Sequence, residues 1–311
     1  MNSHRLASLA RKAAQGWSGA EYGLISDPGV FPIDWRERSA PADSDGAVRV
    51  ASPAGRYVHP VESAFRVIAL LQTLELTPIH ERPPGILAQL ERTVSALVSS
   101  QSRDGSFRYP VEVPRYATPP GWSSGMAQGL VFHCLTAAQP HLPPKTADRA
   151  RSCAGPALDH LLMSQEDGGC SDFDTAGRPF FQECPSNPPS YILNGAAFAI
   201  LSLTLSPSST AQRAAEQAAL RLAEMLPQWD LGYWSRYDLF DRTPSSPDYH
   251  SLHVTLLRAL GQHYPTQPFD AAATRMAEQR AQRSNRARAF SSLIAHRAAD
   301  LMYSFEKRRG Q

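Results

Sequence analysis

The chain has 311 residues, of which 42% are hydrophobic, and its formal net charge is +2. This length and apolar content are enough for a substantial core, in one large domain or two smaller ones. The small net charge, together with the absence of a recognisable nucleic-acid motif, argues against a nucleic-acid partner.

The four cysteines, Cys134, Cys153, Cys170 and Cys184, are too few and too irregularly spaced for a disulfide framework or a zinc site of the Cys-x-x-Cys type. We expect thiols. The N-terminus has positive charges but no apolar core of signal-peptide length, and no later apolar run is long enough to span a bilayer. The sequence therefore predicts a soluble cytoplasmic protein without a membrane partner.

The first 54 residues predict an N-terminal arm. A short amphipathic helix is expected at the start, followed by irregular chain that includes the apolar stretch 31–35 and a loop-like stretch through Asp45 and Gly46. The segment is too short for a core of its own. We expect an arm, with a hairpin, packed on a main domain of residues 55–311.

From Val58 onward the spacing of apolar residues is helical, as in Val61, Phe65 and Ile68, and strand-like alternation is scarce. The expected helices are 59–76, 86–101, 124–138, 147–165, one that follows Ser190, 210–226, 249–261, and one or two within the basic stretch 269–307. The basic stretch is interpreted as a solvated amphipathic helix rather than a nucleic-acid or lipid tail. The chain is thus predicted to be all-α.

One segment, 180–201, combines a polar loop with an apolar helix. Pro188 and Pro189 disfavour helix before them, Ser190 is the expected N-cap, and the residues that follow are nearly all apolar or small. A helix that is apolar on all sides is a buried one. The loop before it, which carries Glu183 and Cys184, is therefore a rigid candidate for the floor of an active site.

An internal repeat supports a particular architecture. Residues 95–109 and 159–173 each end a helix in Ser-Gln, close a turn on Asp-Gly and continue to an aromatic residue. Repeated helical hairpins suggest an α/α toroid, an incomplete (α/α)6-type barrel whose loops line a cavity. The alternative is that Asp-Gly is simply a common turn.

Polar and aromatic residues gather just before several expected helices, in segments 57–60, 122–128, 233–238 and 248–253. Tyrosine and tryptophan suit sugar rings, because they offer a flat apolar face and a polar tip. Taken one at a time, a tyrosine or tryptophan is more often a packed core residue than a ligand-binding one. His250 and His253 are three residues apart, but no matching third ligand accompanies them, so no metal is expected.

Several of these motifs resemble one family. Residues 123–129 (SSGMAQG), 188–195 (PPSYILNG), 235–239 (SRYDL) and 248–253 (DYHSLH) look like the C-terminal catalytic domain of glucuronyl C5-epimerases, which invert glucuronate to iduronate in heparan-type chains. The resemblance extends from Val58 to about Leu260 and implies a helical α/α-barrel. We expect no counterpart of the family's separate β-rich N-terminal domain in these residues.

The resemblance implies roles for individual residues. Glu183, Tyr237 and Tyr249 take the positions of the family's acid/base glutamate and tyrosines, and His250 or Arg236 could lower the pKa of a tyrosine. Substrate-binding roles are expected for His59, Trp122, Gln128, Asn194, Arg236, His250 and His253. No cofactor is expected.

Two positions depart from the family pattern. Cys184 stands where the family has a tyrosine, and Phe240 stands where it has an arginine after the YDL motif. Cys184 is either an inert buried thiol, which we favour, or a thiolate base. Arg236 or Arg242 could replace the missing arginine as the group that binds a uronate carboxylate.

We therefore expect an epimerase that acts at a carbon α to a carboxylate or carbonyl group. Its partner would be a glycan, sugar-acid or peptide substrate, the last in a natural-product pathway, and a homodimer is considered. The alternatives are a non-catalytic sugar- or peptide-binding relative and a lyase, since loss of a β-substituent after the same proton abstraction is elimination.

Overall fold

The computed structural model describes residues 20–53 and 55–309, and the helix expected at the start of the chain lies outside them. Within the described residues the chain is mostly helical, as predicted, with only short strands. The helices are α2 (Pro60–Leu76), α3 (Ile86–Ser99), α4 (Gly125–Ala137), α5 (Pro144–Leu162), α6 (Leu193–Thr204), α7 (Ser209–Met225), α8 (Pro247–His263), α9 (Phe269–Ala281) and α10 (Arg283–Arg309). The strands are β1 (Arg49–Ser52), β2 (Gly55–Val58), β3 (Arg108–Tyr109), β4 (Trp122–Ser123), β5 (Ser171–Phe173) and β6 (Pro179–Phe181).

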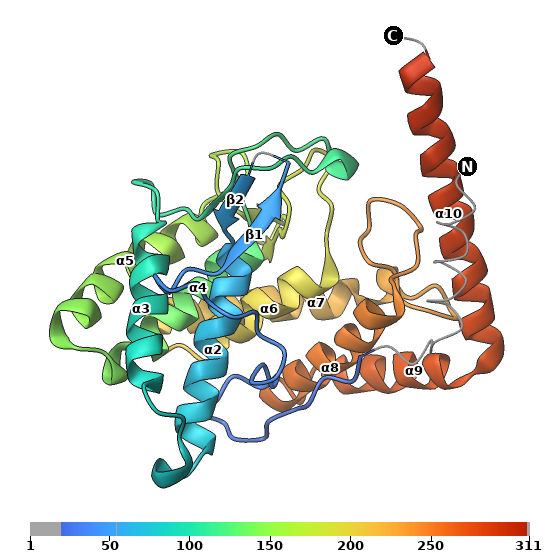
Figure 1. The fold of residues 1–311 in the computed structure, drawn as a ribbon. Helices are drawn as coiled ribbons and strands as arrows, with labels where there is room; N and C mark the ends of the chain where they lie inside the picture. The colour runs from blue at the N-terminus through green and yellow to red at the C-terminus, as the bar shows by residue number, and fades with distance from the viewer. Residues whose placement is uncertain (1–19, 54, 310–311) are drawn as a thin grey trace.

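The helices up to α9 pack in two rows. Helices α2, α4, α6 and α8 pack one beside the next in chain order, and α3, α5, α7 and α9 each pack against the helix that precedes them (Figure 1). Nearly every residue of α4 and α6 is buried, as expected of helices covered on all sides. Successive helical hairpins thus build the domain, while their closure into a toroid stays a prediction.

We call α2, α4, α6 and α8 the inner helices and α3, α5, α7 and α9 the outer helices. Short antiparallel hairpins lead into three of the inner helices: β1 and β2 precede α2, β3 and β4 precede α4, and β5 and β6 precede α6. The internal repeat belongs to this pattern, because each copy runs from an outer helix through an Asp-Gly turn into a strand. Gly105 and Gly168 have φ angles of +83° and +90°, where a side chain would be strained. The repeat is therefore structural and sets where each inner helix begins.

Residues of the arm are part of the core. Phe31 and Trp35 are buried, and the Trp35 ring stacks on Phe65 of α2 with centroids 3.6 Å apart. The buried Gln72 side chain accepts a hydrogen bond from the Trp35 N–H (2.9 Å) and donates to the carbonyls of Phe31 and Ile33 (2.9 and 2.7 Å). An amide side chain that satisfies three buried backbone groups fixes this part of the arm on α2.

The start of α6 differs from the prediction. Its N-cap is Ile192 rather than Ser190, and the helix begins at Leu193. The Ser190 hydroxyl donates to the Cys184 carbonyl (3.0 Å), inside the preceding loop, and Tyr191 has a φ of +48°, which is incompatible with a helix. The loop therefore uses its own polar groups to hold its shape, and the helix starts two residues later than an N-cap at Ser190 would require.

The basic stretch forms two helices, α9 and α10, which was one of the two predicted outcomes.

All four cysteines are free thiols. No helix in the described part of the chain has the length and apolar character needed to cross a bilayer, and the cellular compartment stays a prediction.

Candidate active site

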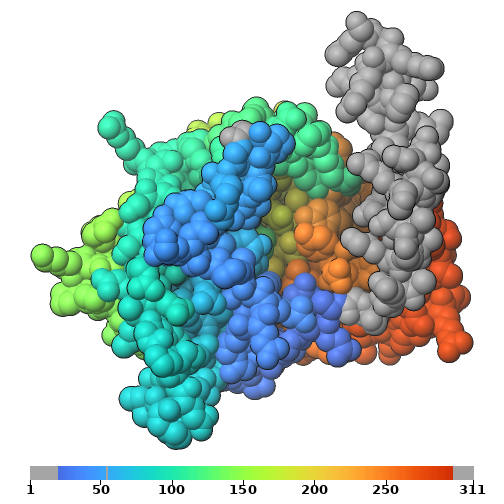
Figure 2. Space-filling model, in the orientation of Figure 1, coloured from blue at the N-terminus to red at the C-terminus, as the bar shows by residue number. Residues whose placement is uncertain are grey.

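A pocket of about 590 Å³ opens where the N-terminal ends of α2, α4, α6 and α8 meet. Residues at each of these four helix starts line it, and the arm adds one wall. In Figure 2 a hollow lies between the blue arm, the green loops above it and the orange residues around α8. Helix N-termini carry partial positive charge, which these four helix starts contribute to the pocket.

Glu183 lines the pocket from the loop before α6. Its Oε2 accepts a hydrogen bond from Asn194 Nδ2 (3.0 Å), and its Oε1 accepts one from the Tyr237 hydroxyl (3.5 Å). The side chain lies directly against Gly195, where a Cβ atom would come within 2.4 Å of Glu183 Cβ and Oε2. The Asn-Gly pair at the start of α6 therefore makes the space and supplies a donor for this carboxylate.

Burial raises the pKa of Glu183 to about 7, although the hydrogen bonds from Tyr237 and Asn194 oppose the shift. A carboxyl group with a pKa near neutrality exists in both protonation states under physiological conditions. Such a group can abstract a proton and return it, which suits acid/base catalysis. Strong pKa shifts of this kind are typical of functional sites.

Tyr237 and Tyr249 lie beside Glu183. Their rings meet edge to face with centroids 4.7 Å apart, and Tyr249 lines the pocket while Tyr237 lies behind it against Glu183. Burial raises the pKa of both phenols. The expectation that His250 or Arg236 lowers a tyrosine pKa is therefore not met, and both hydroxyls are protonated donors near neutral pH.

An aromatic wall forms another side of the pocket. Tyr109 and Trp122 stack with centroids 4.3 Å apart, and His59 meets Tyr109 edge to face at 5.2 Å. His59 also caps α2, because its Nδ1 accepts the Glu62 N–H (3.2 Å), and burial lowers its pKa to about 4. We infer that the ring is neutral with its proton on Nε2, so it can donate to a ligand. Of the expected substrate-binding residues, His59, Trp122 and Asn194 line the pocket.

Gln128 does not line the pocket. Its side chain is fully buried, where its Oε1 accepts the Phe107 N–H (2.8 Å) and its Nε2 donates to the carbonyls of Gly105 and Ala157 (both 3.2 Å). These bonds fix the Asp-Gly turn after α3 against α5.

His250 and His253 also lie outside the pocket, fully buried. Their Nδ1 atoms both approach the Ser235 hydroxyl (2.8 and 3.0 Å), and His250 Nε2 lies 2.9 Å from the Met276 carbonyl, to which it donates. Burial lowers the pKa of both rings, to about 4 and about 3. The two histidines thus hold the loop that carries Tyr237 on the helix that carries Tyr249.

Cys184 is buried beside Tyr116 and Ile192, away from the pocket, with its Sγ 3.3 Å from the Thr118 hydroxyl. Burial raises the pKa of its thiol to about 11. A thiol with this pKa holds its proton near neutrality, which favours the inert interpretation over the thiolate base.

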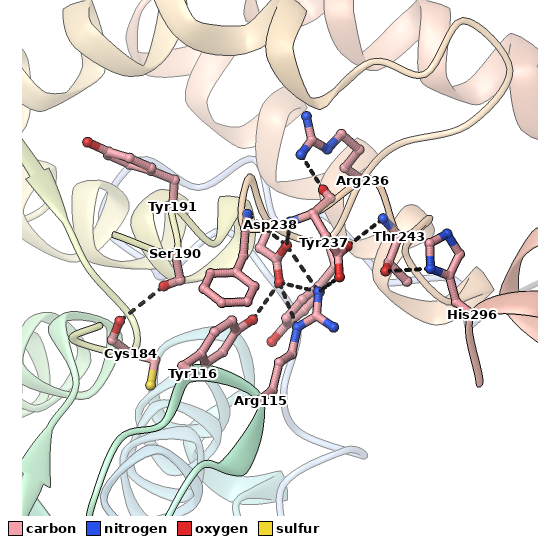
Figure 3. A network of polar contacts seen from close by, with 12 residues as sticks. Arg115, Tyr116, Cys184, Ser190, Tyr191, Arg236, Tyr237, Asp238, Thr243 and His296 are labelled. Atoms are coloured by element: carbon pink, nitrogen blue, oxygen red, sulfur yellow. Dashed lines mark hydrogen bonds and ion pairs between the residues drawn. The ribbon is translucent and has the colours of Figure 1, made fainter. Parts of the chain in front are cut away.

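Arg236 is bound to backbone carbonyls, those of Gln228 (3.2 Å) and Asp241, and does not line the pocket. A neighbouring network centres on the fully buried Asp238, which accepts hydrogen bonds from the Tyr116 hydroxyl (2.5 Å) and from Arg115 (3.0 Å) (Figure 3). This network ties the YDL segment to the loop before β4.

Several residues that line the pocket were not singled out from the sequence as site residues, and four of them add charge or a phenol to it. Tyr22 and Arg38 come from the arm, Glu62 from the first turn of α2, and Asp248 from the first turn of α8, where it accepts the Ala20 N–H (2.9 Å). Asp248 stands in a motif that the sequence had marked, and Glu62 follows His59 by three residues. No local pattern marks Tyr22 or Arg38, because only packing of the arm brings them to the site.

The described residues contain no group of three or more histidine, cysteine, aspartate or glutamate side chains placed to hold a metal ion. The described side chains bring to the pocket the near-neutral carboxyl group of Glu183, two further carboxyl groups, the Arg38 guanidinium, protonated phenols and the neutral His59 imidazole.

Comparison with known proteins identifies the family of this chain. The family model described as "D-glucuronyl C5-epimerase C-terminus" matches residues 101–278, more than half of the chain. A D-glucuronyl C5-epimerase of Caenorhabditis elegans is 30% identical over 188 residues, which cover 52% of this chain and 30% of the relative. The chain thus aligns with less than a third of the relative's length. The match includes Glu183, Tyr237 and Tyr249, and the chain belongs to the D-glucuronyl C5-epimerase family through that family's C-terminal domain.

Proposed function

We propose that this protein is an epimerase that inverts the carbon α to the carboxylate of a uronic acid residue in a glycan. One observation carries the proposal: the Glu183 carboxyl group, with a pKa near 7, lies in a pocket beside Tyr237 and Tyr249. Family membership supports the reaction type, because the Caenorhabditis elegans relative is named a D-glucuronyl C5-epimerase.

In the proposed reaction, ionised Glu183 abstracts the proton from the α carbon on one face of the sugar ring. Tyr249, whose phenol is protonated, returns a proton to the opposite face, and the reverse reaction exchanges the two roles. Tyr237 donates a hydrogen bond to Glu183 and holds the carboxylate in position to react with the substrate. Charge that builds up on the substrate carboxylate is stabilised by donors and by the helix N-termini around the pocket.

We also infer that the two rows of helices form an incomplete α/α barrel, with the arm before residue 55 laid on a catalytic domain that starts there. The packing of α2, α4, α6 and α8 in sequence supports this inference. The stacked Tyr109 and Trp122 rings would provide the flat apolar face that a sugar ring requires.

The proposal is tested by incubation of the protein in deuterated water with heparosan oligosaccharides that contain glucuronate. We expect deuterium to be incorporated at C5 and iduronate to form, and NMR detects both. Formation of an unsaturated uronate would indicate a lyase instead, and binding without exchange would indicate a non-catalytic relative.

Variants test the assigned roles. Glu183→Gln and Tyr249→Phe should each lower the exchange rate by about 10²-fold or more, the usual contribution of a positioned acid or base. Glu166→Gln is the matched control, because Glu166 is an exposed glutamate outside the pocket. Full activity in folded Glu183→Gln and Tyr249→Phe proteins would refute the assignment.

A further inference from the structure

The pocket depends on the arm, a segment outside the part of the chain that matches the family model. Tyr22, Trp35 and Arg38 all line it. Trp35 is anchored by the buried Gln72 and by stacking on Phe65, so the residues next to it are held in place as well. The arm is therefore a fixed wall of the site.

Arg38 differs from every other described residue that lines the pocket, because it alone carries a permanent positive charge. Glu62, Glu183 and Asp248 are acidic, and burial lowers the pKa of His59 to about 4, which leaves that ring neutral. A carboxylate that enters this pocket therefore meets three acidic groups, and Arg38 is the one described side chain there that attracts it at neutral pH.

Among the described residues, the Arg38 guanidinium donates one side-chain hydrogen bond. Its Nη2 donates to the Glu21 carbonyl (2.5 Å), and its Cζ lies 4.7 Å from the centre of the Tyr22 ring. No carboxylate of the described residues forms an ion pair with it, whereas the neighbouring Arg36 is bound to Asp34 (2.7 Å). An arginine presents five N–H donors in a planar fork that matches a carboxylate, so Arg38 can bind an anionic ligand without loss of a protein partner.

The other arginines in this region do not supply that charge: Arg242 is exposed and does not line the pocket, and two others are already engaged. Arg115 forms ion pairs with Asp238 (2.9 Å) and Asp241 (3.0 Å), and Arg236 donates to backbone carbonyls. Neither lines the pocket. The position where the family pattern has an arginine is Phe240, so this region of the described structure offers no unpaired cation facing the pocket.

We propose that Arg38 is the residue that binds the carboxylate of the substrate and makes the site specific for an acidic sugar. This inference rests on the proposed function, since it names the group that recognises the substrate of the same reaction. The arm thereby supplies the positive charge that is missing after the YDL motif.

The test compares an acid with its neutral ester. Exchange at C5 in deuterated water is measured for a glucuronate-containing heparosan oligosaccharide and for its carboxyl methyl ester, with wild-type protein, Arg38→Gln, Arg38→Lys and Arg36→Gln. Arg38→Gln should lower kcat/KM for the acid by about 5-fold, as expected when the partner in an exposed charge pair is removed, and should leave the value for the ester nearly unchanged. Arg38→Lys should restore part of the preference for the acid, and Arg36→Gln should retain all of it.

The ester separates recognition from structure. If Arg38 only held the arm through Glu21, Arg38→Gln would lower the rates for acid and ester equally, and that result would overturn the proposal. An unchanged preference for the acid in a folded Arg38→Gln protein would overturn it too.

Calorimetric titration with the same oligosaccharide separates the two proposals. Binding that depends on Arg38, without exchange in the wild-type protein, would refute the epimerase and support the role of Arg38. Exchange in the wild-type protein that does not depend on Arg38 would support the epimerase and refute the role of Arg38. If the wild-type protein neither binds the oligosaccharide nor exchanges its C5 proton, both proposals are refuted.

Discussion

Gly195 offers a direct test of how the site is built. A methyl group on Gly195 would lie 2.4 Å from Glu183 Cβ and Oε2 and 2.9 Å from Glu183 Cγ. Ordinary contact begins at 3.4 Å, so Gly195→Ala requires the Glu183 side chain to move by about 1 Å. A displacement of about 1 Å at a reacting group can cost about 10²-fold in rate, which corresponds to about 2.7 kcal/mol of transition-state stabilisation.

The effect on stability should be smaller than the effect on rate. Alanine is favoured over glycine inside a helix by roughly 0.5–1 kcal/mol, whereas overpacking costs about 1–3 kcal/mol. We therefore expect Gly195→Ala to lower the free energy of unfolding by about 1–2 kcal/mol while kcat/KM for C5 exchange falls by about 10²-fold.

Gly155 is the matched control. It lies in the exposed part of α5, and a Cβ atom built there has no neighbour within 4 Å outside its own helix. Gly155→Ala should change the free energy of unfolding by less than about 1 kcal/mol with unchanged activity, because the helix preference for alanine is opposed by a contact of the new Cβ with the Pro156 ring. Urea unfolding and the deuterium-exchange assay measure both quantities. A Gly195→Ala protein with wild-type kcat/KM would show that the position of Glu183 against α6 does not matter for catalysis.

Four further predictions concern the residues around this site. The exchange rate should rise with pH to a plateau above about 7, because Glu183 must be ionised to abstract the proton; Glu183→Gln should abolish this rise. The folded-state pKa of Glu183 is above its unfolded value, so its contribution to stability is lost as pH rises through about 7. Glu183→Gln should therefore be more stable than the wild-type protein at pH 8 by up to about 3 kcal/mol, from about 1.4 kcal/mol per pKa unit, and the difference should vanish near pH 4 in thermal melts. Cys184→Ala should keep kcat/KM within a few-fold of wild type, since the thiol lies outside the pocket and its pKa is about 11; a 10²-fold loss by a folded variant would restore the thiolate-base hypothesis. Asp238→Asn should lower the free energy of unfolding by about 2–4 kcal/mol in urea titrations, because Tyr116 and Arg115 lose a buried charged acceptor; an unchanged midpoint would show that the network does not stabilise the fold.

The sequence predicted the helices well because their apolar spacing is local information. It also predicted that Glu183, His59, Trp122, Asn194 and Tyr249 would lie near helix starts, and the structure brings these residues to one pocket. Both successes depend on the same regularity: the loop before each inner helix ends at the same face of the domain.

What the sequence could not predict depends on packing between distant segments. A buried glutamine and a ligand-binding glutamine look alike in sequence, and only the structure shows that Gln128 satisfies backbone groups. The same holds for His250, whose nitrogens bond to Ser235 and the Met276 carbonyl. Arg38 was missed for the opposite reason, since nothing in its local sequence shows that the arm folds over the pocket.

The two departures from the family pattern are connected through one side chain. Cys184 packs in the same small cluster as Tyr116, and Phe240 meets the Tyr116 ring edge to face with centroids 5.4 Å apart. The two residues that depart from the pattern implied by the resemblance thus both lie near Tyr116, whose hydroxyl donates to Asp238. Since the change is shared by neighbours, it is better understood as one apolar repacking of this corner than as two separate losses of catalytic groups. If the protein acts on a uronic acid as proposed, the group that binds the substrate carboxylate has to come from elsewhere around the pocket, and among the described residues the arm is the segment that brings a cation there.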